Sequence, residues 1–173
     1  MVADNQQERL DAEWIVGFTD GEGCFHVAIN KIDKMSLGWQ VLPEFRIVQH
    51  EKNEETLHKI KSYFDFGEVK INHSDKHGTR KEFRVRGLEN LNKLVQFFKQ
   101  HEFQTLSKQK SFEKFVEIIE LMNNKEHLTK DGLNKIAKLI SKMNRQPKIK
   151  YLESPETIRQ TQIDICDDIV RTE

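Results

Sequence analysis

The amino-acid sequence predicts an α+β fold in which a helix is followed by two strand–strand–helix repeats and then by further helices. Three observations support this prediction. Alternating apolar and polar residues mark four strands, apolar residues at helical spacing mark the helices, and turn residues separate the paired strands. Strands joined by short turns pair antiparallel, so we expect a four-stranded antiparallel sheet. We expect the helices to cover one face of this sheet and to leave the other face polar.

The first three elements of the chain are predicted to be a helix and two strands. Residues 14–19 are nearly uncharged, which indicates a helix buried against protein. Phe25, Val27 and Ile29 alternate with small or polar residues and indicate a half-buried strand. A second strand is expected over residues 39–50, where the same alternation continues.

Asn53 is placed to cap the helix that completes the first strand–strand–helix repeat. Gly67 is expected to start a third strand, in which Val69 and Ile71 face the helices. The fourth strand is predicted around Phe83, which alternates with charged neighbours. These two strands and the helix that follows them therefore repeat the strand–strand–helix order of the preceding segment.

Three more helices complete the prediction. Apolar residues at helical spacing run through residues 88–98, a further helix begins at Ser107, and Thr129 caps the last one. We expect one domain over residues 1–146, large enough to bury its own core, and an acidic C-terminal tail over residues 147–173.

The 173-residue chain has no net charge, but its charges are unevenly distributed. Residues 1–25 carry six acidic and one basic side chains, and residues 151–173 carry six acidic and two basic ones. Residues 26–86 carry twelve basic and nine acidic side chains, and residues 87–150 carry thirteen and seven. The basic central part could bind phosphates, but a solvated surface of mixed charge explains the same counts equally well.

The composition excludes several classes of protein. The chain has no long apolar run and no signal-peptide pattern, so we expect a soluble protein that does not bind a membrane. Cys24 and Cys166 lie far apart and lack the spacing of zinc ligands, which favours two reduced thiols.

The most specific pattern is the segment Trp14-Ile-Val-Gly-Phe-Thr-Asp-Gly-Glu-Gly-Cys-Phe25. Gly17 lowers helix stability and is explained if another backbone approaches closely there. Gly21 and Gly23 are expected to end the helix with unusual backbone dihedrals. Glu22 then lies at a helix C-terminus, where the helix dipole disfavours anions, so its position points to a bound metal ion. Taken alone, the segment also fits a buried helix with a glycine-rich end.

This segment resembles the motif of LAGLIDADG homing endonucleases, and the resemblance extends over roughly residues 8–145. It implies a LAGLIDADG homing-endonuclease-like αββαββα core whose four-stranded antiparallel sheet forms a DNA-binding saddle. It also implies a site-specific endonuclease that hydrolyses both strands of DNA with Mg²⁺. Mn²⁺ is expected to substitute for Mg²⁺, and Ca²⁺ is expected to bind without supporting cleavage.

The same resemblance implies roles for single residues. Glu22 would bind the metal with the carbonyl of Gly21, Gln49 would position a water molecule, and Lys108 would stabilise charge in the transition state. Asn53 stands where such enzymes often carry a basic residue. One acidic motif provides one cutting site, so the resemblance implies a homodimer on a long pseudo-palindromic DNA site. The contact between the two copies of the dimer is expected on the first helix, at Ile15, Val16, Gly17, Phe18 and Asp20.

The polar face of the sheet is expected to contact double-stranded DNA, because side chains on alternate strand positions share one face. Its members are Ala28, Asn30, Gln40, Arg46, Lys70, Asn72, Arg84 and Arg86. Within this set we expect Arg46 to contact a base, since it lies in the middle of its strand.

Two other functions fit the same scaffold. One is an intron-RNA maturase, and the other is a DNA-binding regulator without catalysis. Gln49 and Lys108, each taken alone, fit ordinary surface positions better than catalytic ones. Genes of the family usually lie in introns, often organellar, so a chloroplast or mitochondrial location is expected from the resemblance.

Overall fold

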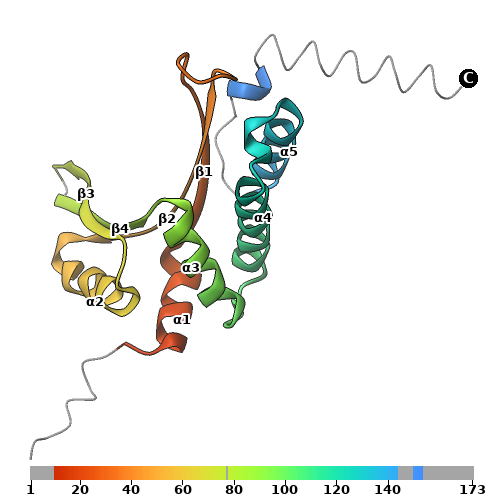
Figure 1. The fold of residues 1–173 in the computed structure, drawn as a ribbon. Coiled ribbons are helices and arrows are strands. Elements are labelled where there is room, and N and C mark those ends of the chain that lie inside the picture. The colour runs from red at the N-terminus through yellow and green to blue at the C-terminus, as the bar shows by residue number, and fades with distance from the viewer. Residues whose placement is uncertain (1–9, 77, 144–149, 154–173) are drawn as a thin grey trace, which may run out of the picture. The chain divides into compact units, whose positions relative to one another are not determined.

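A computed structural model describes residues 10–76, 78–143 and 150–153 of the chain (Figure 1). The order of its helices and strands is the predicted one. The helices are α1 (Ala12–Glu22), α2 (Glu54–Phe64), α3 (Leu88–Lys99), α4 (Leu106–Asn123) and α5 (Lys130–Ser141). The strands are β1 (Gly23–Lys31), β2 (Trp39–His50), β3 (Glu68–Asp75) and β4 (Gly78–Val85). Short 3-10 turns cover Glu51–Asn53, Glu126–Leu128 and Lys150–Glu153.

The four strands form one sheet in the order β1-β2-β4-β3. β4 pairs antiparallel with both β2 and β3. Ile47 lies opposite Phe83, which lies opposite Val69 on its other side, so these apolar side chains share one face. Arg46 lies opposite Arg84 on the other face. The predicted α+β class with a four-stranded antiparallel sheet is confirmed.

The described residues divide into two compact units. The first unit comprises the residues up to 26 together with residues 43–119. The second comprises residues 27–42 and the described residues from 120 onward. In the first unit, α2 and α3 lie on one side of β3 and β4, as Figure 1 shows. The predicted tail over residues 147–173 lies outside the described residues except for 150–153, as does Cys166.

The core of the first unit is aromatic. Phe25 is 3% exposed and stands at its centre. Its ring lies 5.1–5.8 Å from the rings of Phe45, Phe98, Phe103, Phe112 and Phe115. Rings at these distances and inclined to one another pack favourably and contribute beyond the area that they bury. This cluster joins the start of β1 to α3 and to the first half of α4.

The second unit has an aliphatic core. α5 begins after Thr129, whose hydroxyl accepts a hydrogen bond from the Gly132 amide at 3.1 Å, so the predicted cap is confirmed. The helix buries Leu133, Ile136 and Ile140. Trp39 packs edge-to-face on Tyr151, whose hydroxyl donates to Asn134 Oδ1 at 2.6 Å.

Two local predictions were wrong. Asn53 precedes α2 but does not cap it through its side chain, because its amide donates instead to Gln49 Oε1 at 3.3 Å. Ile71 was expected against the helices but is 59% exposed. Ile71 pairs in register with Lys81, but β3 is an edge strand and all its residues from Ile71 onward are exposed, including those beyond the irregularity between Ile71 and His73.

None of the helices in the described part of the chain is long and apolar enough to cross a membrane.

Candidate active site

Glu22 is the last residue of α1 and is exposed to solvent. The helix begins at Asp11, whose carboxylate accepts a hydrogen bond from the Trp14 amide at 2.6 Å. At the other end, the Gly23 amide donates to the Thr19 carbonyl, and β1 begins at once. The last carbonyls of a helix have no intrahelical partners and carry the negative end of its dipole. The Glu22 carboxylate therefore adds to an electronegative helix end that suits a cation.

We had expected unusual backbone dihedrals at Gly21 and Gly23, and this prediction was wrong. Gly23 is required because there is no space for a side chain. Its φ of −72° and ψ of 148° are open to any residue, and Gly21 is helical. A Cβ atom at Gly23 would lie 2.5 Å from Thr19 Cγ2 and 2.8 Å from the Thr19 carbonyl. The backbone thus passes from helix to strand against Thr19 with no room for a side chain, which fixes the direction of Glu22.

Asp20 connects α1 to the start of α4. Its Oδ2 atom accepts hydrogen bonds from the backbone amides of Gln104 and Thr105, both at 2.9 Å. Its Oδ1 atom accepts from the Thr105 hydroxyl at 2.5 Å. A carboxylate is well suited to these amides, because they precede a helix N-terminus with its partial positive charge. The carboxylate thus acts as a hydrogen-bond acceptor within the chain, and the expected place of Asp20 at a dimer contact stays a prediction.

Lys108 lies in the first turn of α4, and its ammonium donates a hydrogen bond to the Gly23 carbonyl. The structure therefore brings Lys108 beside Glu22, the neighbour of Gly23 in the chain. Burial lowers the pKa of the Lys108 ammonium, while the acidic groups of Cys24, Asp20 and Glu22 act in the opposite direction. Cys24 is a free thiol.

Gln49 lies near the end of β2, opposite Lys81 of β4. Its amide oxygen accepts the hydrogen bond from Asn53, and this contact orients the amide at the strand end. Gln49 and Asn53 were singled out separately in the sequence, and the structure shows that they contact each other.

The polar face of β2 and β4 carries a cluster of arginines around a buried carboxylate. Glu44 is only 5% exposed. Its Oε2 atom lies 2.6 Å from Arg86 Nη2 and 3.6 Å from Arg84 Nη1, and its Oε1 atom lies 3.7 Å from Arg46 Nη1. We had not predicted this role for Glu44, although Glu44-x-Arg46 and Glu82-x-Arg84-x-Arg86 show acidic and basic residues alternating on one face.

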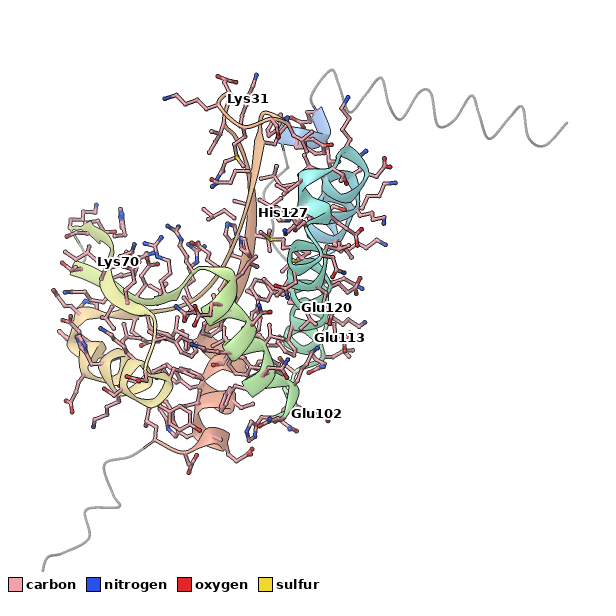
Figure 2. All side chains as sticks on the ribbon, viewed as in Figure 1. Lys31, Lys70, Glu102, Glu113, Glu120 and His127 are labelled. Atoms are coloured by element: carbon pink, nitrogen blue, oxygen red, sulfur yellow. The ribbon has the colours of Figure 1, made fainter. Side chains whose placement is uncertain are left out.

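A second buried carboxylate lies beside the first. Glu82 accepts from Arg84 Nη2 at 2.6 Å and from the Asn72 amide at 2.7 Å, and it is 2% exposed. Lys70 pairs with Glu68 at 2.8 Å. Figure 2 shows side-chain nitrogen atoms gathered on the side of β3 and β4 where Lys70 is labelled. The predicted DNA-facing side chains of these strands therefore share one face.

The other predicted DNA-facing residues lie in the second unit. Ala28 and Asn30 are on β1, and Gln40 is at the start of β2. Asn30 is exposed, and Ala28 and Gln40 are half-buried. Ala28 alternates with the buried Val27, so it points away from the apolar face of β1.

One face of α1 is apolar and exposed. Trp14 is 40% exposed and stacks on Phe18 with ring centroids 4.8 Å apart. Gly17 and Gly21 are exposed on the same face, because residues three, four and seven positions apart align on a helix. Ile15 and Val16 were also expected at a contact with a second copy, but both are buried in the chain's own core. Their exposed fractions are 0% and 4%.

Comparisons with known proteins show the family to which the chain belongs. A family model described as LAGLIDADG endonuclease matches residues 15–119, a range that includes Glu22, Gln49 and Lys108. The probable intron-encoded endonuclease 2 of Neurospora crassa is 33% identical over 138 residues, which cover 78% of this chain and 29% of that protein. The chain spans less than a third of the length of the first curated relatives that it matches.

Two solved structures are similar in fold and sequence. The crystal structure of the homing endonuclease I-TnaI is 41% identical, with a TM-score of 0.78, and the match covers 88% of this chain and 98% of that one. I-SmaMI bound to an uncleaved DNA target in the presence of calcium ions is 31% identical, with a TM-score of 0.74. That match covers 86% of this chain and 48% of I-SmaMI. The protein belongs to the LAGLIDADG endonuclease family.

Proposed function

We propose that this protein is a homing endonuclease that cuts both strands of a specific duplex DNA site as a homodimer with Mg²⁺. The observation that carries the proposal is the nearness of Lys108 to Glu22. Glu22 ends α1, and the Lys108 ammonium donates a hydrogen bond to the carbonyl of the next residue, Gly23. Phosphodiester hydrolysis requires an activated water molecule and neutralised phosphate charge. A metal ligand beside a cationic side chain can provide both.

Glu22 and the carbonyl of Gly21 would hold the metal ion. Carboxylate and carbonyl oxygens are the ligands that Mg²⁺ prefers, with water and phosphate oxygens in its other positions. Among the described residues, no group of three or more His, Cys, Asp or Glu side chains could hold a metal ion. One carboxylate and one carbonyl oxygen at the end of α1 are donors that fit an ion whose other positions are filled by phosphate and water. When bound, Mg²⁺ would activate water and neutralise phosphate charge.

The same oxygen donors determine which ions could replace Mg²⁺ at this site. Mn²⁺ accepts oxygen ligands in the same octahedral arrangement and would substitute for Mg²⁺. Ca²⁺ is larger and more flexible in its coordination, so it would bind without supporting cleavage. The presence of calcium ions with uncleaved DNA in the I-SmaMI structure supports this expectation.

The chain's own groups would act around the scissile phosphate. The Lys108 ammonium would stabilise the negative charge that develops on the phosphate oxygens, because a partly buried cation is weakly screened by water. Gln49, oriented by Asn53, would hold the attacking water through its amide. Asp20 would keep the start of α4 against α1, so that Lys108 stays beside Glu22.

A homodimer would supply the second cut. Trp14, Gly17, Phe18 and Gly21 form the exposed apolar face of α1, and glycines at 17 and 21 would allow two helices to approach closely. Packing two such faces about a two-fold axis would bring two Glu22 residues together. The chain matches nearly all of I-TnaI but only 48% of I-SmaMI, which is consistent with two copies being needed.

The polar face of the sheet would bind DNA as a saddle, and two copies would read two half-sites of a long pseudo-palindromic target. Phosphate contacts would position the duplex, and the arginines would read base edges. Residues 1–146 would form the endonuclease domain, with 147–173 as an acidic tail. The gene would lie in an organellar intron, and the intron-encoded relatives support this part of the proposal.

The test combines binding selection with cleavage. The purified chain is incubated with a long randomised duplex library in Ca²⁺, and the bound duplexes are then exposed to Mg²⁺. We expect cleavage of the selected duplexes by the wild type, and binding without cleavage by Glu22→Gln, whose amide cannot provide an anionic ligand. Cleavage by Glu22→Gln at the native rate would contradict the metal site. Tighter binding to structured intron RNA than to any duplex would favour a maturase, and binding without cleavage by the wild type would favour a regulator.

A further inference from the structure

The arginine cluster on β2 and β4 poses an electrostatic problem. Arg46 and Arg84 lie directly opposite each other on neighbouring strands, and like charges in this position repel. Arg86 directly follows the end of β4, and its guanidinium contacts the same carboxylate, Glu44. Such a cluster keeps a defined geometry only if carboxylates compensate the repulsion.

Glu44 provides this compensation at the centre of the cluster. It is 5% exposed, so the side chains around it cover its carboxylate. Arg86 donates to its Oε2 atom through both Nε, at 2.7 Å, and Nη2, at 2.6 Å. Its two oxygens also lie within 3.7 Å of nitrogens of Arg46 and Arg84. A single buried carboxylate therefore contacts three guanidinium groups.

The three arginines differ in what remains available to a ligand. The side chains of Arg86 and Arg46 are 43% and 33% exposed, whereas that of Arg84 is 14% exposed and is also bound by Glu82. Glu44 occupies the Nε and Nη2 side of Arg86, which leaves Nη1 directed elsewhere. Arg86 and Arg46 thus combine a fixed anchor on the protein with donors exposed to solvent.

An arginine held in this way binds DNA differently from a mobile one. A mobile guanidinium contacts phosphates in any sequence and adds affinity without discrimination. A guanidinium with a fixed plane and position can donate to the O6 and N7 atoms of guanine, and it leaves donors unpaired at other bases. The fixed arrangement therefore favours base recognition over general affinity.

We propose that Glu44 is a positioning residue for sequence recognition, which holds Arg46 and Arg86 in the orientations that read bases. This inference rests on the proposed DNA-binding function and adds to it a residue that determines specificity without touching DNA. Glu44 lowers affinity for DNA in general, because it removes positive charge from the face, and it raises the preference for particular base pairs.

The test compares Glu44→Gln with Glu68→Gln. Both substitutions remove one negative charge from the same face, but Glu68 is 55% exposed and pairs with Lys70 at 2.8 Å and with Arg84 Nε at 3.7 Å, whereas Glu44 contacts Arg46 and Arg86. Each protein binds a randomised duplex library in Ca²⁺ for its base preferences, and poly(dI-dC) duplex at several salt concentrations for its general affinity. Thermal unfolding checks that each variant is folded.

For Glu44→Gln we expect tighter binding to poly(dI-dC), with a salt slope steeper by about one. We also expect loss of base preference at the positions that Arg46→Ala and Arg86→Ala affect. Glu68→Gln should bind poly(dI-dC) more tightly as well, but keep the wild-type base preferences. If Glu44→Gln keeps every preference, or Glu68→Gln loses the same ones, Glu44 has no positioning role.

Glu44→Asp provides the test if Glu44→Gln does not fold. It keeps the charge but withdraws the carboxylate from the arginines, so base preference should weaken at the same positions without a gain in poly(dI-dC) affinity. Unchanged preferences in this variant would also overturn the proposal. A wild type that binds no duplex at all would instead overturn the proposed function itself, together with this inference.

Discussion

Asp20 and Thr105 join the two halves of the candidate site. The Asp20 carboxylate accepts hydrogen bonds from both the amide and the hydroxyl of Thr105, at 2.9 Å and 2.5 Å. Thr105 immediately precedes α4, and Lys108 lies in the first turn of that helix. The placement of Lys108 near Glu22 therefore rests on this contact, which involves neither of them, as well as on the hydrogen bond from Lys108 to the Gly23 carbonyl.

Asp20→Asn should weaken this connection. The amide can still accept a hydrogen bond but has no charge for the helix N-terminus, so we expect a loss of about 1–2 kcal/mol of stability. We expect faster hydrogen exchange at the amides of Gln104 and Thr105, and slower DNA cleavage with binding retained. Glu55→Gln is the control, because Glu55 is an exposed carboxylate of α2 that pairs with Lys59 of its own helix. Unchanged exchange at Thr105 would contradict this role of Asp20.

Gly17→Leu should separate a dimer without harming the single chain. A Cβ atom at Gly17 would meet no atom of the described residues within 4 Å, so a larger side chain fits the protomer. Replacing glycine in an exposed helix position should even stabilise α1 by roughly 0.5–1 kcal/mol. We expect sedimentation to show a monomer that is inactive toward duplex DNA. Glu55→Leu, on the exposed face of α2, should remain dimeric. A monomeric wild type or a dimeric Gly17→Leu protein would refute the α1 contact.

Lys108→Met should change the pH dependence of stability. Burial lowers the pKa of Lys108 from its ordinary 10.5, so the folded chain holds this proton less tightly than the unfolded chain. Stability therefore rises with pH between the lowered pKa and 10.5, because the unfolded state binds more protons there. We expect Lys108→Met to be more stable than the wild type at neutral pH, with the difference shrinking in alkaline solution. Denaturant unfolding at several pH values measures this, and a constant difference would contradict it.

Arg46→Ala and Lys70→Ala should affect DNA binding in different ways. Arg46 is expected to contact a base, so its loss should cost roughly 1–3 kcal/mol of discrimination at one position of the target. Lys70 lies on β3 beside the exposed Glu68 and suits a phosphate contact. Its loss should weaken binding to all sequences and lower the salt slope by about one. If Arg46→Ala leaves the base preference unchanged at every position, the predicted orientation of β2 toward DNA is wrong.

Features that depend on neighbouring residues could be predicted from the sequence. The alternation over residues 39–50 matches β2, which covers Trp39–His50. Thr129 was recognised as a helix cap because its partner, Gly132, lies three residues away. The place of Glu22 at the C-terminus of α1 was likewise predictable, since the glycines and acidic residues that mark this helix end are adjacent in the chain.

Features that depend on pairing between distant segments could not be predicted. Glu44 has the pattern of an exposed strand residue, and it is buried only because arginines of β4 lie beside it in the sheet. Ile71 pairs in register with Lys81, but β3 is an edge strand whose residues are all exposed from Ile71 onward, which the alternation alone does not signal. Asn53 had the right residue type for a cap, but the end of β2 offered its side chain another partner in Gln49.

The contacts of Asp20 and Gly23 with residues 104–108 also determine when the site can form. They join residues about 85 positions apart in the chain, and such distant contacts form slowly because a long loop must close first. During synthesis α1 emerges well before α4, so Glu22 is made long before Lys108 can reach it. A nascent or partly folded chain that lacks α4 therefore has only one half of the candidate site, which becomes complete only when the long loop between the two halves has closed.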